Sequence, residues 1–203
     1  MVVKTKANPI EKIQGFLKDH NGILLTSDLA KLGIPRTYLS ILLKNCEIQR
    51  VSRGVYSAAN YLIDEMASIQ ARYKGAIFSH ETALYLLELT DRSPFFYSVT
   101  VPAGYNATLL KASGAKVYFV NREVYLLGLI TMKSPYRNDI RIFNLERTIC
   151  DVLRNRNQMD VQFVNQSLKK YVTHKDRDFD QLYNYAMQFR IPKIVREYLE
   201  VLL

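Results

Sequence analysis

The sequence predicts an α+β protein in two parts: a small helical domain with a β-hairpin, then a larger domain in which helices cover a small sheet. Two observations support this prediction. Between Thr26 and Ser57, apolar residues recur first at helical spacing and then alternate as they do in strands. Between residues 95 and 143, short apolar runs separated by Pro and Gly indicate several strands. We expect domains at 1–59 and 60–203.

The composition restricts the class of protein. The 203 residues are 48% hydrophobic and 23% charged, as expected of a folded chain. No apolar run approaches the roughly 20 residues of a membrane-spanning helix, and the start, MVVKTKANPIEK, lacks the apolar core of a signal peptide. We therefore expect a cytoplasmic protein without a membrane partner. The net charge of +9 favours a polyanionic partner, and residues 1–57 carry +5 of it.

The N-terminal domain is expected to start with a basic arm, residues 1–7. A helix follows from Asn8 to His20, because Asn8 is a good cap and Pro9 suits the first helical position. Residues 23–25 are apolar and could form a short strand that pairs with a later hairpin.

The next stretch has the pattern of a winged helix-turn-helix. A first helix can start at Thr26 or Ser27, either of which can cap it. Gly33 ends this helix because glycine adopts the left-handed conformation cheaply. The second helix reads RTYLSILLKN, and Pro35, directly before this run, suits the first helical position. A basic hairpin follows, with Gly54 in its turn. Two helices joined by a short turn and followed by such a hairpin are typical of DNA-binding domains.

We expect the second helix to lie in the major groove of DNA. Arg36 is the best candidate for recognising guanine, because its donor fork matches O6 and N7. Tyr38 could contact DNA or pack under the hairpin, and Arg50 or Arg53 could enter the minor groove. The candidate DNA-binding residues are Arg36, Thr37, Tyr38, Ser40, Lys44, Gln49, Arg50 and Arg53. The candidates for an extended basic surface are Lys4, Lys6, Lys111, Lys116, Arg122, Lys169 and Lys170.

The larger domain is expected to begin with a connecting helix at 61–73 and a second helix, capped by Ser79, within 76–89. Strands are expected in the runs FFYSVTV, KVYFV, VYLLGLIT and DIRIFN, and residues 121–123 could join the second and third runs as a hairpin. Helical periodicity predicts the remaining helices at 145–154, 160–171, 179–189 and 192–203.

The sequence contains no recognised catalytic pattern. It has no GxGxxG or GxxxxGK[ST] phosphate loop, no HExxH, no paired CxxC and no GxSxG. Cys46 and Cys150 are expected to be reduced and buried, and His80 to pack or cap a helix. We expect no enzymatic activity, no cofactor and no metal.

Acidic residues could still mark a DNA-processing nuclease. The candidates are Asp64, Glu65, Glu81, Asp139, Glu146 and Asp151. A metal-dependent nuclease would need one acidic residue and, on an adjacent strand, a second just before a lysine, and the predicted strands lack this pair. Glu146 or Asp151 is expected instead to pair with an arginine such as Arg147 or Arg154.

The run SDLAKLGIPRTYLSILLKNCEIQRVSRGVYS resembles the N-terminal domain of the AbiEi-type antitoxins, in which a helix ends in LGI and a wing ends in RGVY. The segments IFSHETALYLLEL, VTVP and LERTICDVL resemble the second domain of that family, so the resemblance covers residues of about 8 to 203. It implies an antitoxin of a type IV toxin–antitoxin system for phage abortive infection.

The resemblance also implies the partners. The toxin would be a nucleotidyltransferase encoded beside the antitoxin and opposed without a stable complex. The winged-helix domain would repress the shared promoter by binding inverted repeats in double-stranded DNA. We expect a monomer in solution and two copies on DNA.

Two other functions remain open on the sequence. The chain could be an ordinary winged-helix regulator whose larger domain binds a small molecule in a pocket lined by Tyr97, Tyr118 and Tyr125. It could also be a nuclease that uses the carboxylates named above. A neighbouring nucleotidyltransferase gene would favour the antitoxin.

Overall fold

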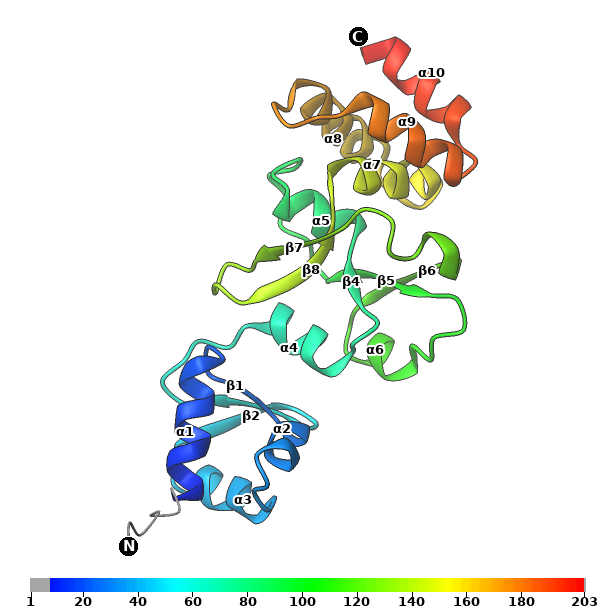
Figure 1. Cartoon of the computed structure of the whole chain (residues 1–203). Helices are drawn as coiled ribbons and strands as arrows, with labels where there is room; N and C mark the ends of the chain where they lie inside the picture. The colour runs from blue at the N-terminus through cyan, green and yellow to red at the C-terminus, as the bar shows by residue number, and fades with distance from the viewer. Residues whose placement is uncertain (1–7, 203) are drawn as a thin grey trace, which may run out of the picture. The chain divides into compact units, whose positions relative to one another are not determined.

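The structure, a computed structural model, describes residues 8–202 (Figure 1). Its predicted α+β class is confirmed. The chain divides into two compact units. Unit 1 consists of the chain up to Lys74 together with the separate segment Lys133–Ile140. Unit 2 consists of Gly75–Met132 and the chain from Arg141 onward. Within the described part of the chain, no helix is both long enough and apolar enough to cross a membrane.

Unit 1 follows the predicted order of elements. These are α1 (Pro9–Asp19), β1 (Ile23–Leu25), α2 (Thr26–Lys31), α3 (Thr37–Lys44), β2 (Ile48–Ser52), β3 (Val55–Ala58) and α4 (Glu65–Arg72). The three strands form an antiparallel sheet in the order β1-β3-β2, which confirms that residues 23–25 pair with the hairpin. The core is a cluster of aliphatic side chains from α1, α2, α3 and the sheet: Ile13, Leu17, Leu24, Leu29, Ile34, Leu39, Leu42 and Ile48.

The start of α2 differs from the predicted cap. Neither Thr26 nor Ser27 caps the helix; the carboxylate of Asp28 accepts a hydrogen bond from the backbone N–H of Leu25 at 3.0 Å. Asp28 also binds the ammonium of Lys31 at 2.9 Å. A buried carboxylate in the first turn therefore replaces a hydroxyl cap, and it interacts favourably with the helix dipole.

The end of α3 is a Schellman motif. The N–H of Glu47 donates to the carbonyl of Leu42 at 2.9 Å, and the N–H of Cys46 donates to that of Leu43 at 3.1 Å. Cys46 occupies the left-handed position of this motif, with φ of 56°. The prediction that Cys46 is buried was therefore wrong, because this position turns its side chain out to solvent. Cys150 is buried, as predicted.

The hydrogen bonds of Asp64 connect α4 to another segment of unit 1. Its buried carboxylate caps α4 through the N–H of Ala67 at 2.9 Å. The same carboxylate accepts hydrogen bonds from the hydroxyl of Ser134 and from Nδ2 of Asn138, the latter at 2.8 Å. These bonds join α4 to the turn at 133–140. The unit boundary at Lys74 therefore differs from the predicted domain boundary near residue 60.

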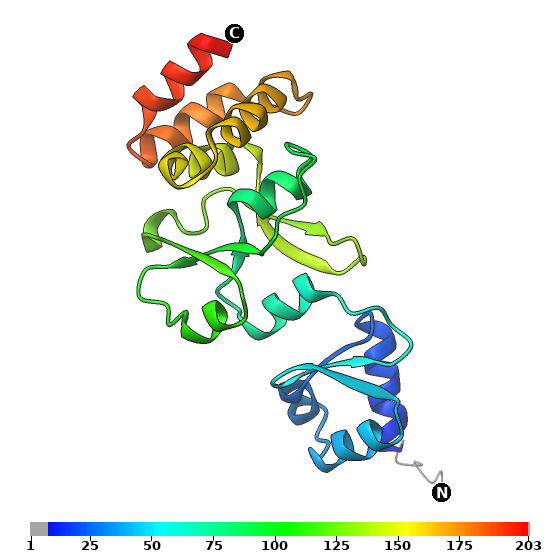
Figure 2. The same ribbon diagram turned by 180° about the vertical axis from the view of Figure 1, so that it is seen from behind.

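Unit 2 combines a five-stranded sheet with helices. Its elements are β4 (Ile77–Phe78), α5 (His80–Leu86), β5 (Ser98–Pro102), α6 (Thr108–Ala112), β6 (Lys116–Val120), the 3-10 turn η1 (Arg122–Val124), β7 (Leu129–Lys133), β8 (Asp139–Phe143), α7 (Leu145–Arg154), the 3-10 turn η2 (Arg156–Gln158), α8 (Val161–Thr173), α9 (Phe179–Gln188) and α10 (Pro192–Leu202). The turn between β7 and β8 is the part assigned to unit 1. Helices α7 to α10 gather at one end of unit 2 (Figure 2).

The sheet order is β6-β5-β4-β8-β7. β5 pairs with β6 and β4 pairs with β8 in parallel, whereas β4 and β5 are antiparallel. The predicted hairpin between KVYFV and VYLLGLIT was wrong, because β6 and β7 occupy opposite edges of the sheet. The first half of VYLLGLIT leaves the sheet because its carbonyls at Val124 and Leu127 bind Arg147 of α7.

Candidate nucleic-acid interface

α3 turns one face to the core and the opposite face to solvent. Leu39 and Leu42 are buried in the aliphatic core of unit 1. Thr37, Ser40 and Lys44 are exposed on the other side, and Arg36 is exposed at the N-cap position. The residues predicted to read DNA from this helix are therefore available to a ligand. Tyr38 is half-buried and packs against the core.

The hairpin of β2 and β3 provides the second part of this surface. Gln49, Arg50 and Arg53 are exposed, and Val55 is buried beneath them. The strand register shifts between Arg50 and Ser52, a bulge that increases the local twist of the hairpin. Arg53 and Gly54 form the turn, and Gly54 has the φ of 79° that glycine tolerates.

The hairpin turn is tied to the start of α2. The backbone N–H of Thr26 donates to the carbonyl of Gly54 at 3.0 Å. This bond fixes the turn against the helix-turn-helix, so Arg53 is carried on a restrained wing. A restrained wing orders its cation before DNA binds, which lowers the entropic cost of association.

Two acidic residues of the same domain, Asp28 and Glu47, already have partners. Asp28 binds Lys31, and Glu47 accepts hydrogen bonds from Gln14 at 2.9 Å and Asn45 at 3.2 Å. Within residues 8–202, Arg36, Lys44, Arg50 and Arg53 make no ion pair. These four exposed cations of α3 and the wing are therefore free for phosphates or base edges. We call them the cationic set.

The predicted extended basic surface is less available than the cationic set. Lys116 is bound to Glu81 at 2.8 Å, and Lys170 to Asp91 at 2.8 Å. Arg122 donates through Nε to a backbone carbonyl at 3.3 Å. Lys111 and Lys169 are exposed. Lys4 and Lys6 lie outside the described residues.

Five of the six candidate nuclease carboxylates have polar partners, and the sixth, Glu65, is exposed. Glu81 accepts a hydrogen bond from the hydroxyl of Ser98 at 2.7 Å, in addition to its bond with Lys116, and Asp139 pairs with Lys133 at 2.7 Å. Glu146 accepts hydrogen bonds from the hydroxyl of Tyr171 and the N–H of Asp178, at 3.3 and 3.0 Å. Among the described residues, no three His, Cys, Asp or Glu side chains gather closely enough to hold a metal ion.

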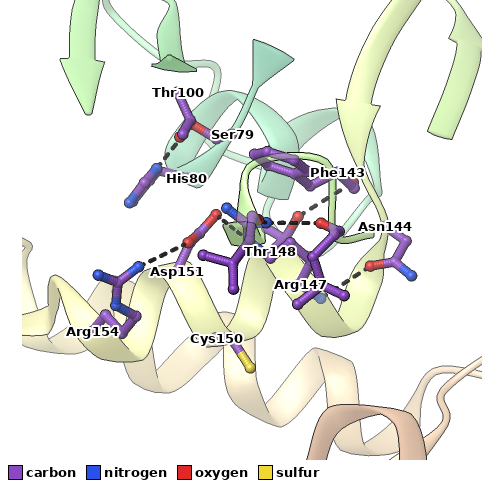
Figure 3. Close-up of polar contacts among 12 residues, drawn as sticks. Ser79, His80, Thr100, Phe143, Asn144, Arg147, Thr148, Cys150, Asp151 and Arg154 are labelled. Atoms are coloured by element: carbon purple, nitrogen blue, oxygen red, sulfur yellow. Dashed lines mark hydrogen bonds and ion pairs between the residues drawn. The ribbon is translucent and has the colours of Figure 1, made fainter. Parts of the chain in front are cut away.

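Asp151 forms the predicted pair with arginines inside α7 (Figure 3). Its carboxylate binds Nε of Arg147 at 3.1 Å and Nη1 of Arg154 at 3.8 Å. Burial raises the pKa of Asp151, and the two arginines act in the opposite direction. This geometry is that of a structural ion pair.

Arg147 makes more contacts in unit 2 than the predicted ion pair. It is the largest fully buried side chain of residues 8–202. Its Nη1 donates to the carbonyls of Val124 and Leu127 at 2.8 and 2.7 Å. Its guanidinium lies 3.9 Å from the ring centre of Phe143 and 4.5 Å from that of Phe189. The signal available in the sequence is an Arg–Asp pair at i and i+4 in the helical segment RTICDVL.

His80 is packed, as predicted, and lies in a second buried polar network (Figure 3). Its Nδ1 lies 2.9 Å from the hydroxyl of Ser79, and its Nε2 accepts from the amide of Asn155 at 2.9 Å. Its ring stacks on Tyr118 with 3.4 Å between ring centres. Burial lowers the pKa of His80 well below its ordinary value of 6.5, and nearby cations, led by Lys116, act in the same direction. The imidazole is therefore neutral at neutral pH.

The three tyrosines of the alternative ligand pocket have separate packing roles. Tyr118 stacks on His80, and the hydroxyl of Tyr125 donates to the carbonyl of Gly75 at 2.7 Å. Tyr97 meets the ring of Phe78 edge-on. The structure thus gives each ring a partner in the packing of unit 2.

Residues 11–59 match the family model described as "Transcriptional regulator, AbiEi antitoxin". The resemblance to the AbiEi antitoxins is confirmed over these residues. The matched segment runs from α1 to the end of β3, so it contains the whole cationic set of this AbiEi-type domain.

A structural comparison extends beyond the AbiEi-type domain. The chain matches a crystal structure of the RV2827C protein from Mycobacterium tuberculosis with a TM-score of 0.51 and 12% sequence identity. The match covers 95% of this chain and 80% of that one. At this identity the likeness shows the fold alone. No curated protein matches the chain.

Proposed function

We propose that the chain is a DNA-binding antitoxin that represses its own operon at inverted repeats in the promoter. The observation that supports this proposal most strongly is the cationic set, which lies exposed and unpaired on the AbiEi-type domain. Arg36 would recognise guanine in the major groove, and Lys44 would contact phosphate. Arg50 and Arg53 of the wing would bind in or beside the minor groove.

The proposal gives each copy one half-site. A monomer would meet its neighbour on the inverted repeat, since two-fold symmetry in the DNA calls for two copies of the reading domain. Binding to promoter DNA would place the protein in the cytoplasm, and the proposal includes no catalytic step and no cofactor.

We assign the antitoxin activity to unit 2. Its three segments that resemble the AbiEi antitoxins correspond to β4 with α5, to β5, and to α7. The target would be a nucleotidyltransferase toxin encoded beside the chain, opposed without a stable complex. This division separates DNA binding in unit 1 from neutralisation in unit 2.

Footprinting on the DNA upstream of the gene tests the repressor function. The purified chain should protect two inverted half-sites. Arg36→Ala should weaken binding by about 1–3 kcal/mol and relax the preference at one base pair. Lys12→Ala, which removes an exposed charge from α1, is the matched control and should retain the footprint. No protection by the wild-type chain, or equal loss in both variants, would contradict the proposal.

Co-expression with the neighbouring gene tests the antitoxin function. The wild-type chain should restore growth in cells that express the toxin, and the double variant Arg36→Ala, Lys44→Ala should restore it equally when its level is matched. Affinity purification of the chain should recover no stoichiometric toxin. Failure of the wild-type chain to restore growth would remove the antitoxin assignment and leave a DNA-binding regulator.

A further inference from the structure

One large apolar side chain lies in the middle of the polar face of α3. Ile41 is 43% exposed and is not part of the aliphatic core of unit 1. Thr37, Ser40, Ile41 and Lys44 recur at i, i+3, i+4 and i+7, so they form one continuous stripe along the outer face of the helix. Each of the four is exposed.

The position of Ile41 has no structural explanation within its own domain. The core side of α3 is filled by Leu39 and Leu42, which are 5% and 1% exposed. A polar residue at 41 would suit a solvated helix face at least as well, because β-branched side chains lose rotamer freedom in helices. Scattered exposed apolar residues are common, but Ile41 stands between the cations at Arg36 and Lys44.

The chemistry of the major groove supplies an apolar partner. Thymine is the base that presents a methyl group there, and apolar side chains discriminate it by contact with that C5-methyl. The rest of the stripe offers hydroxyls and an ammonium, which bind base edges and phosphates. An isoleucine at the centre of such a stripe therefore matches an A·T pair within the half-site.

We propose that Ile41 is a specificity-determining residue that recognises a thymine by packing against its C5-methyl group. This inference rests on the proposed DNA binding through α3. It names the base that the helix reads beside the guanine assigned to Arg36. Ile41 contributes sequence preference, whereas the cationic set contributes most of the salt-dependent affinity.

Removing the methyl group from the DNA tests this proposal directly. Operator duplexes would be prepared with thymine and with deoxyuridine in its place, and a set of duplexes with one substitution each would locate the position. Binding of the full chain to each duplex would be measured by fluorescence anisotropy. Wild-type protein should bind about fourfold more weakly when the critical methyl is absent, which corresponds to about 0.8 kcal/mol for one buried methyl.

Ile41→Ala completes a double-mutant cycle. The variant should bind the thymine duplex about as weakly as wild type binds the uracil duplex, and it should not distinguish the two. Ile41→Val, which keeps a branched apolar side chain, should retain the distinction. Circular dichroism melts should be unchanged for both variants, because Ile41 lies outside the core.

The outcomes distinguish failure of the proposed DNA-binding function from failure of the thymine contact alone. If wild-type protein binds neither duplex in preference to shuffled DNA, the proposed function fails. If it binds the operator but ignores every methyl deletion, the thymine contact is overturned while the proposed function stands. If Ile41→Ala retains the methyl effect and Thr37→Ser abolishes it, Thr37 is the reader and the assignment to Ile41 is wrong.

Discussion

Replacing Arg147 with alanine should strongly destabilise unit 2. The substitution deletes a fully buried guanidinium that two carbonyls, one carboxylate and two phenyl rings surround. Asp151 would remain 2% exposed, with only the more distant Arg154 as a charged partner at 3.8 Å. A buried carboxylate that loses its nearest cation is left with an uncompensated cost of desolvation.

The magnitude follows from this geometry. Removing one partner of a buried ion pair costs about 3–5 kcal/mol. The carbonyls of Val124 and Leu127 would also lose charge-assisted donors. We therefore expect a loss of at least about 4 kcal/mol, since these contributions overlap rather than add. Arg154→Ala is the matched control, because its side chain is 32% exposed and its pair should be worth about 1 kcal/mol or less.

Hydrogen exchange of the α7 amides, followed by mass spectrometry, measures this loss within unit 2 alone. The double variant Arg147→Ala, Asp151→Ala should recover part of the stability, since it removes the stranded carboxylate. A loss below about 1 kcal/mol in Arg147→Ala, or equal losses in Arg147→Ala and Arg154→Ala, would refute the view that Arg147 organises unit 2.

Three further predictions concern backbone conformation and pH. Cys46→Gly should raise the free energy of unfolding by about 1 kcal/mol, because glycine relieves the left-handed strain at φ of 56°; an unchanged urea midpoint would contradict this. Gly128→Ala should destabilise unit 2 in the same assay, since a Cβ there would lie 2.5 Å from Cβ of Arg147; a neutral effect would refute the close packing. Burial lowers the pKa of His80, so the unfolded chain binds a proton there more readily than the folded chain does. The contribution of His80 to the free energy of unfolding should therefore be constant above pH 6.5 and should fall as the pH drops below that value. His80→Asn, which tolerates the φ of 48°, should flatten that part of the urea-midpoint profile, and an unchanged slope would contradict the assignment.

The helix-turn-helix could be predicted because its signals are local. Gly33, the proline before α3 and Gly54 each fix a turn through their own backbone preferences. The cap of α2 was missed because Asp28 reaches back to Leu25, in a place where two hydroxyl residues offered the commoner solution. The left-handed Cys46 was missed because glycine is the usual signal for that position.

The strands of unit 2 could be predicted from the sequence, but their order in the sheet could not. The runs KVYFV and VYLLGLIT are close in sequence, so a hairpin was the simplest connection. Arg147 holds the carbonyls of Val124 and Leu127 from 23 and 20 residues away in the chain. No local pattern reveals such a bond.

The sequence predicts the exposure of the residues on α3, but it does not predict which lysines of the extended basic surface are held in ion pairs. Exposure of Arg36, Ser40 and Lys44 follows from helical spacing alone. Lys116 and Lys170 were counted as free cations because their partners, Glu81 and Asp91, lie 35 and 79 residues away. Ile41 was overlooked because an apolar residue on a helix is first assigned to the core.

The central claim is that the cationic set binds promoter DNA in a sequence-specific way. Its most direct test is the affinity of the full chain for its own upstream DNA and for a shuffled duplex, measured by anisotropy across a salt series. We predict a preference of at least about 10³ for the upstream DNA at physiological salt. The plot of log affinity against log salt should have a slope of about −3 to −4, as three to four phosphate contacts from the cationic set require. Equal affinity for both duplexes, or a slope near −1, would contradict the claim.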